Sequence, residues 1–184
     1  MKIDDKIIVS GQNYQIIRLL GRGKGGYSYL AETDGQPIVL KQIHHEPCDY
    51  YTFGNKIEAE RRDYQRLLDA GIRIPRMLAI DPEQERIVKE YIEGPTVYDC
   101  VLNHRPDDIL LPQVREMAAR AKAAGLNIDY FPTNFVIRDG LLWYIDYECN
   151  DYMDQWNFEN WGVRYWSRTP DFEEYLRQHG QKSP

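Results

Sequence analysis

Cysteine is scarce in this chain, with only Cys48, Cys100 and Cys149 among 184 residues. Their odd number and wide spacing form neither a CxxC pair nor a disulfide framework. The four histidines add no metal-ligand spacing, so we expect no structural zinc site. A reducing cytoplasm is the expected setting.

Long apolar runs and an excess of positive charge are also missing. No segment approaches the roughly 20 apolar residues that a membrane-spanning helix needs, and the N-terminus lacks the apolar core of a signal peptide. The formal net charge of −6 argues against a general binder of nucleic acid or anionic membranes. We therefore expect neither nucleic acid nor a membrane among the partners.

The composition, with 42% hydrophobic and 28% charged residues, is typical of a globular protein of one domain or two small lobes. Short β-branched and alternating runs predict strands, and apolar stripes that end near glycine predict helices. The predicted strands are 6–9, 14–20, 27–32, 38–43, 78–80 and 86–91, with a hairpin of 135–137 and 141–145; the predicted helices are 55–70, 97–103 and 112–124.

A glycine-rich segment contains Gly21-x-Gly23-x-x-Gly26. In a dinucleotide-binding fold this pattern opens a helix, but the following Tyr-Ser-Tyr-Leu-Ala favours a strand. The segment is therefore predicted to be a hairpin tip, where glycines let backbone N–H groups approach phosphates. An ordinary glycine-rich hairpin is the alternative.

Lys41 follows Gly26 by fifteen residues, inside the apolar run Ile-Val-Leu-Lys-Gln-Ile. A lysine buried there needs a negatively charged partner, either a phosphate or a carboxylate. Glu60, on the next predicted helix, is the candidate partner, and Glu58 competes for the role. The alternative is that Lys41 extends its charge to solvent from an edge strand.

Three oxygen-bearing side chains cluster around the later hairpin. Asn134 follows Asp129 by five residues, and Asp146 comes after Leu-Leu-Trp-Tyr-Ile. Such a set of oxygen ligands suits Mg-nucleotide chemistry. For Asp129 alone, a turn or helix-cap role would be the simpler interpretation.

The segment from the glycine loop at Gly21 to Lys41 resembles the phosphate-binding end of the protein-kinase-like superfamily. The resemblance implies that Lys41 and Glu60 position the phosphates of ATP together with the glycine loop. The stretch ending at Gly94 resembles the kinase hinge, which implies that backbone groups of Glu90, Tyr91 and Ile92 hold adenine.

By the same resemblance, Asp129 orients the acceptor hydroxyl, and Asn134 and Asp146 hold Mg²⁺. The chain also departs from protein kinases: Asn127 stands where His is usual, Lys89 where a neutral gatekeeper is usual, and Tyr-Glu replaces Phe-Gly after Asp146. No Ala-Pro-Glu segment follows. Spacing near the first helix is similar to RIO-type kinases, while Ile-Asp-Tyr-Glu looks more like aminoglycoside and choline kinases.

The expected fold class is α+β, a protein-kinase-like bilobal fold with a β-rich N-lobe (1–93) and a strongly reduced helical C-lobe (94–184). The expected function is ATP-dependent phosphotransfer to a hydroxyl, with Ser/Thr of an unknown protein as the favoured acceptor. A small-molecule kinase and a nucleotide-binding pseudokinase scaffold are the alternatives. His44-His45 is interpreted as exposed polar residues, and the aromatic segment 150–179 as internal packing.

Overall fold

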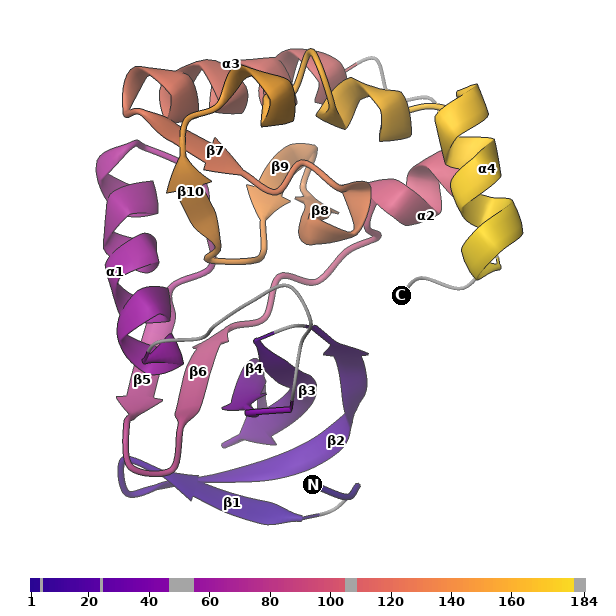
Figure 1. Ribbon diagram of the computed structural model, residues 1–184. Coiled ribbons are helices and arrows are strands. Elements are labelled where there is room, and N and C mark those ends of the chain that lie inside the picture. The colour runs from indigo at the N-terminus through magenta and orange to yellow at the C-terminus, as the bar shows by residue number, and fades with distance from the viewer. Residues whose placement is uncertain (4, 24, 47–54, 105–108, 181–184) are drawn as a thin grey trace. The chain divides into compact units, whose positions relative to one another are not determined.

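The computed structural model describes residues 1–3, 5–23, 25–46, 55–104 and 109–180 (Figure 1). Its mixed α/β chain divides into two compact units, Met1–Arg62 with Pro75–Tyr91, and Asp63–Ile74 with Ile92–Pro184. Cys48 lies outside the described residues, and Cys100 and Cys149 are buried free thiols. Among the helices described, none has the length and apolar character needed to cross a membrane.

The first unit is built on a six-stranded antiparallel sheet with strand order β1-β2-β3-β4-β6-β5. The strands are β1 (Lys6–Val9), β2 (Gln12–Arg22), β3 (Gly26–Thr33), β4 (Gln36–Ile43), β5 (Met77–Asp81) and β6 (Arg86–Glu90). These positions confirm the strands predicted from the sequence.

Burial follows the position of each strand in this sheet. β2 alternates between buried Tyr14 and Ile16 and their exposed neighbours, as expected when one face packs on a core. β4 lies between β3 and β6 and is buried continuously from Ile38 to Lys41. Lys41 therefore lies on a central strand of the sheet, not on an edge strand.

Helix α1 (Lys56–Asp69) begins after Asn55, whose side chain accepts a hydrogen bond from the Glu58 N–H at 3.1 Å. It ends before Gly71, which has a φ of +70° and so takes the left-handed conformation typical of a helix C-terminus. The predicted helix 55–70 is confirmed.

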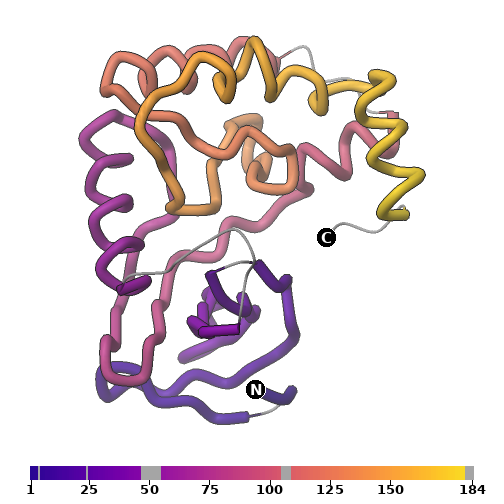
Figure 2. Tube along the Cα trace, in the orientation of Figure 1, coloured from indigo at the N-terminus to yellow at the C-terminus, as the bar shows by residue number. Residues whose placement is uncertain are grey.

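The second unit contains α2 (Val97–Leu102), α3 (Leu110–Ala123), β7 (Leu126–Ile128), β8 (Phe135–Arg138), β9 (Leu141–Tyr144), β10 (Cys149–Asp151) and α4 (Pro170–His179). β8 and β9 form the predicted hairpin, and its turn residues Asp139 and Gly140 have φ of +54° and +72°. Figure 2 shows α3 leading directly into β7, and the later β10 returning beside it. The sequence did not predict β7, β10 or α4, and α3 begins two residues before the predicted start.

Aromatic side chains form much of the core of this unit. The ring of Trp166 lies 5.0 Å from that of Phe135 and 5.4 Å from that of Phe158, and its Nε1–H donates to the Tyr130 carbonyl at 2.8 Å. All four of these residues are buried. The predicted packing role is confirmed for Phe158 and Trp166 but is wrong for Trp156, which is 49% exposed. The buried rings lie directly against Tyr130, the residue after Asp129.

Candidate functional site

The glycine segment forms the tip of the β2–β3 hairpin, as predicted. Gly21 pairs with Ser28 across the hairpin, and the Gly23 N–H donates to the Gly26 carbonyl at 2.9 Å, which closes the tip. Gly26 itself begins β3 opposite Ile43. A Cβ at Gly26 would run into the backbone carbonyl of Gln42, so this glycine is required by the close approach of β3 and β4.

Lys41 and Glu60 form a salt bridge, with only 11% and 14% of their side chains exposed. Glu58 is exposed, so Glu60 is the carboxylate that meets the lysine. The second carboxylate oxygen of Glu60, Oε2, is buried and has no hydrogen-bond partner among the residues that the structure describes. A buried carboxylate oxygen without a donor is uncommon and marks a place where a ligand or water completes the site.

Gly25 lies next to this ion pair, a position that the sequence pattern did not single out. A Cβ placed there would lie 3.5 Å from Lys41 Nζ and 3.8 Å from Glu60 Oε1. The backbone of the glycine loop therefore passes within contact distance of the buried charges. The adjacent pair Gly25-Gly26 is the sequence signal that could have identified it.

Side chains from three segments hold the loop in place. They are Arg22 at the end of β2, Tyr27 in β3, and His44 and Glu46 after β4, and we call them the loop clasp. The Glu46 N–H donates to His44 Nδ1 at 3.2 Å, so the ring hydrogen lies on Nε2, which donates to the Gly23 carbonyl at 3.0 Å. The Glu46 carboxylate accepts the Tyr27 hydroxyl at 2.6 Å and pairs with Arg22. The Tyr27 hydrogen bond lowers the pKa of Glu46, which keeps it charged.

The two adjacent histidines therefore differ. His45 is exposed and lies 2.8 Å from the Glu85 carboxylate, in agreement with the interpretation as surface polar residues. That interpretation is wrong for His44, which is half-buried and bound to the loop, because the end of β4 lies against the hairpin tip.

The predicted hinge consists of Glu90, the last residue of β6, and the two residues that follow it. The Glu90 N–H donates to the Arg76 carbonyl at 2.9 Å, and the Glu90 carboxylate lies 3.4 Å from Arg76 Nε. This N–H is thus already used within the protein. Tyr91 ends the first unit and buried Ile92 begins the second, while Lys89, one residue before Glu90, is buried in β6.

The second unit brings together the three predicted oxygen ligands through one hairpin. Asp129 is the first residue after β7, and Asn134 immediately precedes β8. Asn134 Nδ2 donates to the Asp129 carbonyl at 3.3 Å, and the Ile145 N–H donates to the Asn134 carbonyl at 2.9 Å. Asn134 and Asp146 therefore flank the open end of the same hairpin.

The main chain fixes both carboxylates. Asp129 Oδ1 accepts the Phe131 N–H at 3.0 Å, and Asp146 Oδ1 accepts the Tyr147 N–H at 2.8 Å. Such local bonds restrict the side-chain rotamers of both residues. Both residues are half-buried, so their orientation is set before any ligand arrives.

Tyr144 connects the segments that carry these groups, a role for which the sequence holds no signal. Its buried hydroxyl donates to the Glu148 carbonyl at 2.7 Å and accepts the Asp129 N–H at 3.3 Å. Burial raises its pKa well above the usual value, and the negative charges of Asp146 and Asp129 raise it further. Its two hydrogen bonds join the residue after β7 to the segment after β9.

The donor set of Asp129, Asn134 and Asp146 consists of hard oxygen ligands, which Mg²⁺ prefers. Within the described part of the chain, no group of three or more His, Cys, Asp or Glu side chains could hold a metal ion. A cation at this site would therefore complete its coordination with oxygens from water or from a substrate. Magnesium commonly binds in this way, through one or two carboxylates and the phosphates of a nucleotide.

Comparison with known proteins shows the fold. No model of a known protein family matches the sequence, and no curated protein matches it. The crystal structure of BubR1 kinase domain is similar, with a TM-score of 0.59 and 16% sequence identity over 84% of this chain. The chain spans about half of that domain, 53% of its length. The protein therefore has a kinase-like fold, and identity this low shows the fold alone.

Proposed function

We propose that this chain is an ATP-dependent phosphotransferase with a bilobal, protein-kinase-like fold. The observation that carries the proposal is the buried ion pair of Lys41 and Glu60 next to Gly25. A buried lysine ammonium beside flexible glycine backbone is suited to phosphate oxygens, because it offers up to three donors at a site of low dielectric.

The first unit would bind the nucleotide. The glycine segment would approach the phosphates through its backbone at Gly21 and Gly25, and Gly26 would keep the hairpin close to β4. The Gly23 N–H is excluded from this role because it already donates to the Gly26 carbonyl. Backbone groups of the predicted hinge, from the Glu90 carbonyl through Tyr91 and Ile92, would hold adenine. The Glu90 N–H is excluded from this role because it already donates to Arg76.

The second unit would supply the reaction groups. Asn134 and Asp146 would hold Mg²⁺, which when bound neutralises negative charge on the phosphates. Asp129 would accept a hydrogen bond from the acceptor hydroxyl and orient it for attack. The fixed orientation of both aspartates by backbone N–H groups supports these roles, since phosphoryl transfer depends mainly on positioning.

For the acceptor, we favour Ser/Thr of a protein by analogy with RIO-type kinases, and this leaning is analogy alone. A small-molecule alcohol, as used by aminoglycoside and choline kinases, is the alternative. The buried free thiols of Cys100 and Cys149 suit the proposed cytoplasmic setting.

Transfer from radiolabelled ATP to separate protein and metabolite pools tests the proposal. Asp129→Asn and Asp146→Asn remove one charge each at nearly constant shape, and we expect labelled product to fall by about 10²-fold or more. Asp139→Asn is the matched control, because Asp139 lies in the exposed turn of the same hairpin and asparagine accepts its positive φ. This control should keep wild-type transfer, and the labelled pool identifies the acceptor class.

Thermal unfolding with ATP, with and without Mg²⁺, separates the remaining alternatives. The phosphotransferase should be stabilised by ATP and more so with Mg²⁺, and Asp146→Asn should lose the Mg²⁺ increment. Saturable Mg-ATP binding without transfer to either pool would identify a pseudokinase scaffold instead. Equal transfer by wild type and both aspartate variants would contradict the proposed roles.

A further inference from the structure

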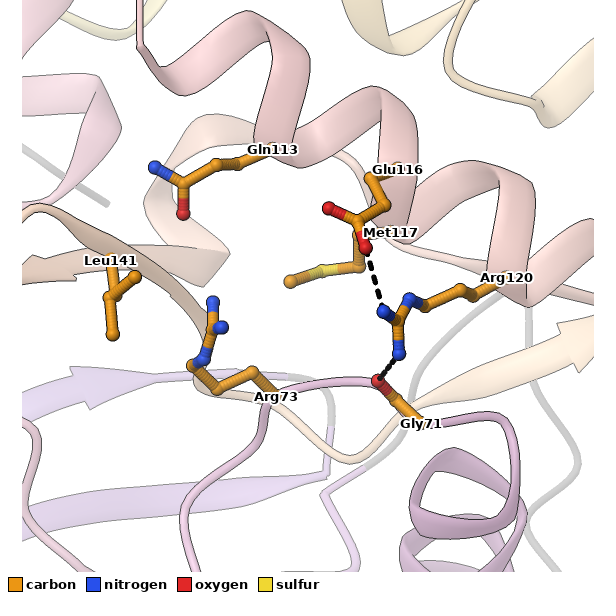
Figure 3. Close-up of a pocket in the computed structure, with 7 residues that line it drawn as sticks. All are labelled: Gly71, Arg73, Gln113, Glu116, Met117, Arg120 and Leu141. Atoms are coloured by element: carbon orange, nitrogen blue, oxygen red, sulfur yellow. Dashed lines mark hydrogen bonds and ion pairs between the residues drawn. The ribbon is translucent and has the colours of Figure 1, made fainter.

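A pocket of about 220 Å³ lies within the second unit, between α3, the segment after α1 and the β8–β9 turn (Figure 3). Arg73 and Arg120 contribute two positive charges to its lining, and Glu116 contributes one negative charge. The lining therefore carries an excess of one positive charge. This volume is below the roughly 300 Å³ at which pockets for drug-sized ligands begin, so only a small molecule of a few heavy atoms would fit.

The two arginines of the pocket have different partners. Arg120 is occupied, because it pairs with Glu116 at 2.6 Å and donates to the Gly71 carbonyl at 3.2 Å. Arg73 donates to the Leu142 carbonyl at 3.0 Å, but no carboxylate in the described part of the chain pairs with it. Arg73 is thus the uncompensated charge of the pocket.

The side chains around Arg73 define what could bind there. Figure 3 shows its guanidinium directed into the pocket, with Gln113 and Met117 on the opposite wall and Leu141 at one side. The Gln113 amide is already used, since it donates to the Gly140 carbonyl at 2.8 Å and accepts the Leu142 N–H at 2.9 Å. Met117 and Leu141 offer apolar surface.

We propose that this pocket binds a small organic anion, whose carboxylate or phosphate group pairs with Arg73 and whose short body packs on Met117 and Leu141. A guanidinium presents parallel N–H donors that match the two oxygens of such a group. The inference needs no catalytic activity, because it rests on the pocket alone.

Arg73 and Gln113, on opposite sides of the pocket, both form hydrogen bonds with strand β9. The Arg73 carbonyl accepts the Tyr144 N–H at 2.9 Å, and Gln113 and Arg73 both bond to Leu142. β9 ends at Tyr144, two residues before Asp146. A bound anion would therefore contact the strand that leads into the proposed metal site, so its predicted effect is slower amide exchange along β9.

A nuclear magnetic resonance titration of the nucleotide-free protein tests the inference, with butyrate and inorganic phosphate as separate probes. We expect saturable shifts of the Arg73 Nε resonance and of the Leu142 amide, and the tighter probe identifies the anionic group. Arg73→Gln should weaken binding about tenfold, the loss typical of one charge-assisted contact. Arg115→Gln is the control, because Arg115 lies on the same helix α3 but is exposed and pairs with Glu159 outside the pocket.

Leu141→Asp tests the same pocket without changing Arg73, so the inference can still be tested if Arg73→Gln fails to fold. Leu141 is 43% exposed, so the new carboxylate is tolerated at the rim and should compete with the anion for Arg73. Shifts no larger than those with sodium chloride at equal ionic strength would overturn the inference. Unchanged binding in both Arg73→Gln and Leu141→Asp would overturn it as well.

Discussion

The glycine loop of the first unit and the aspartate hairpin of the second are held by different kinds of contact. Side chains of the loop clasp hold the loop, and in its outer pair Arg22 and Glu46 are 62% and 40% exposed. The hairpin is held by main-chain bonds to Asp129, Asn134 and Asp146 and by buried aromatic rings.

This difference indicates how each part would treat a ligand. Exposed ion pairs contribute little and rearrange easily, so the loop can adjust to what it covers. Part-buried bonds from main-chain N–H groups to the aspartates cost more to break than exposed ion pairs, so the hairpin presents its oxygens in a fixed arrangement. We therefore expect an adaptable phosphate end and a preorganised metal end, and the following predictions test that comparison.

Removing the aromatic support of the hairpin should have the largest effect. Trp166→Ala removes a buried ring and its bond to the Tyr130 carbonyl, and should lower the free energy of unfolding by about 3–5 kcal/mol. Trp156→Ala is the control, because Trp156 is 49% exposed and its loss should cost less than about 1 kcal/mol. Urea unfolding followed by tryptophan fluorescence reports on this unit, which contains all four tryptophans. Equal losses would contradict the aromatic-core account.

Substitution of two glycines of the loop by alanine should have unequal effects on stability. Gly26→Ala forces a Cβ onto the Gln42 carbonyl and should cost about 1–3 kcal/mol in the free energy of unfolding, as overpacking does. Gly23→Ala has no atom closer than 4.0 Å to the new Cβ and should leave stability unchanged. Chemical denaturation followed by far-ultraviolet circular dichroism checks both. Similar stability of the two variants would show that β3 and β4 can separate at the tip.

Tyr144→Phe should lower the free energy of unfolding by less, about 1–2 kcal/mol, because it removes the hydrogen bonds to the Glu148 carbonyl and from the Asp129 N–H. Folding raises the pKa of Tyr144, so its contribution is complete below the unfolded pKa of about 10 and falls as pH rises above it. The variant should therefore lose less stability than wild type between neutral and strongly alkaline pH. Tyr152→Phe, at a partly exposed tyrosine, should leave this alkaline loss as it is in wild type.

The smallest effect is expected at the loop clasp. His44→Ala removes the hydrogen bond to the Gly23 carbonyl and should speed amide exchange at Gly23 and Gly26 about two- to tenfold, with global stability nearly unchanged. His45→Ala removes only an exposed contact with Glu85 and serves as the matched control. Hydrogen exchange measured by mass spectrometry distinguishes them. If the two variants behave alike, His44 does not hold the loop.

Local sequence patterns predicted the strands of the first unit, helix α1 and the β8–β9 hairpin, because alternation and turn residues act between near neighbours. β7 and β10 were missed because each has only three residues and exists through its pairing with the other. Helix α4 was not predicted, although Thr169 caps it and Pro170 occupies its first turn. The residues 150–179 were interpreted together as an aromatic packing segment, without a separate helix.

By itself, the sequence determined the glycine hairpin, the lysine strand and the order of Asp129, Asn134 and Asp146, since each depends on spacing along the chain. Only the tertiary structure decided that Glu60 rather than Glu58 meets Lys41, that Gly25 lies beside this pair, and that His44 holds the loop. These choices depend on which side chains distant segments bring within hydrogen-bond range. Periodicity along the chain carries no information about that distance.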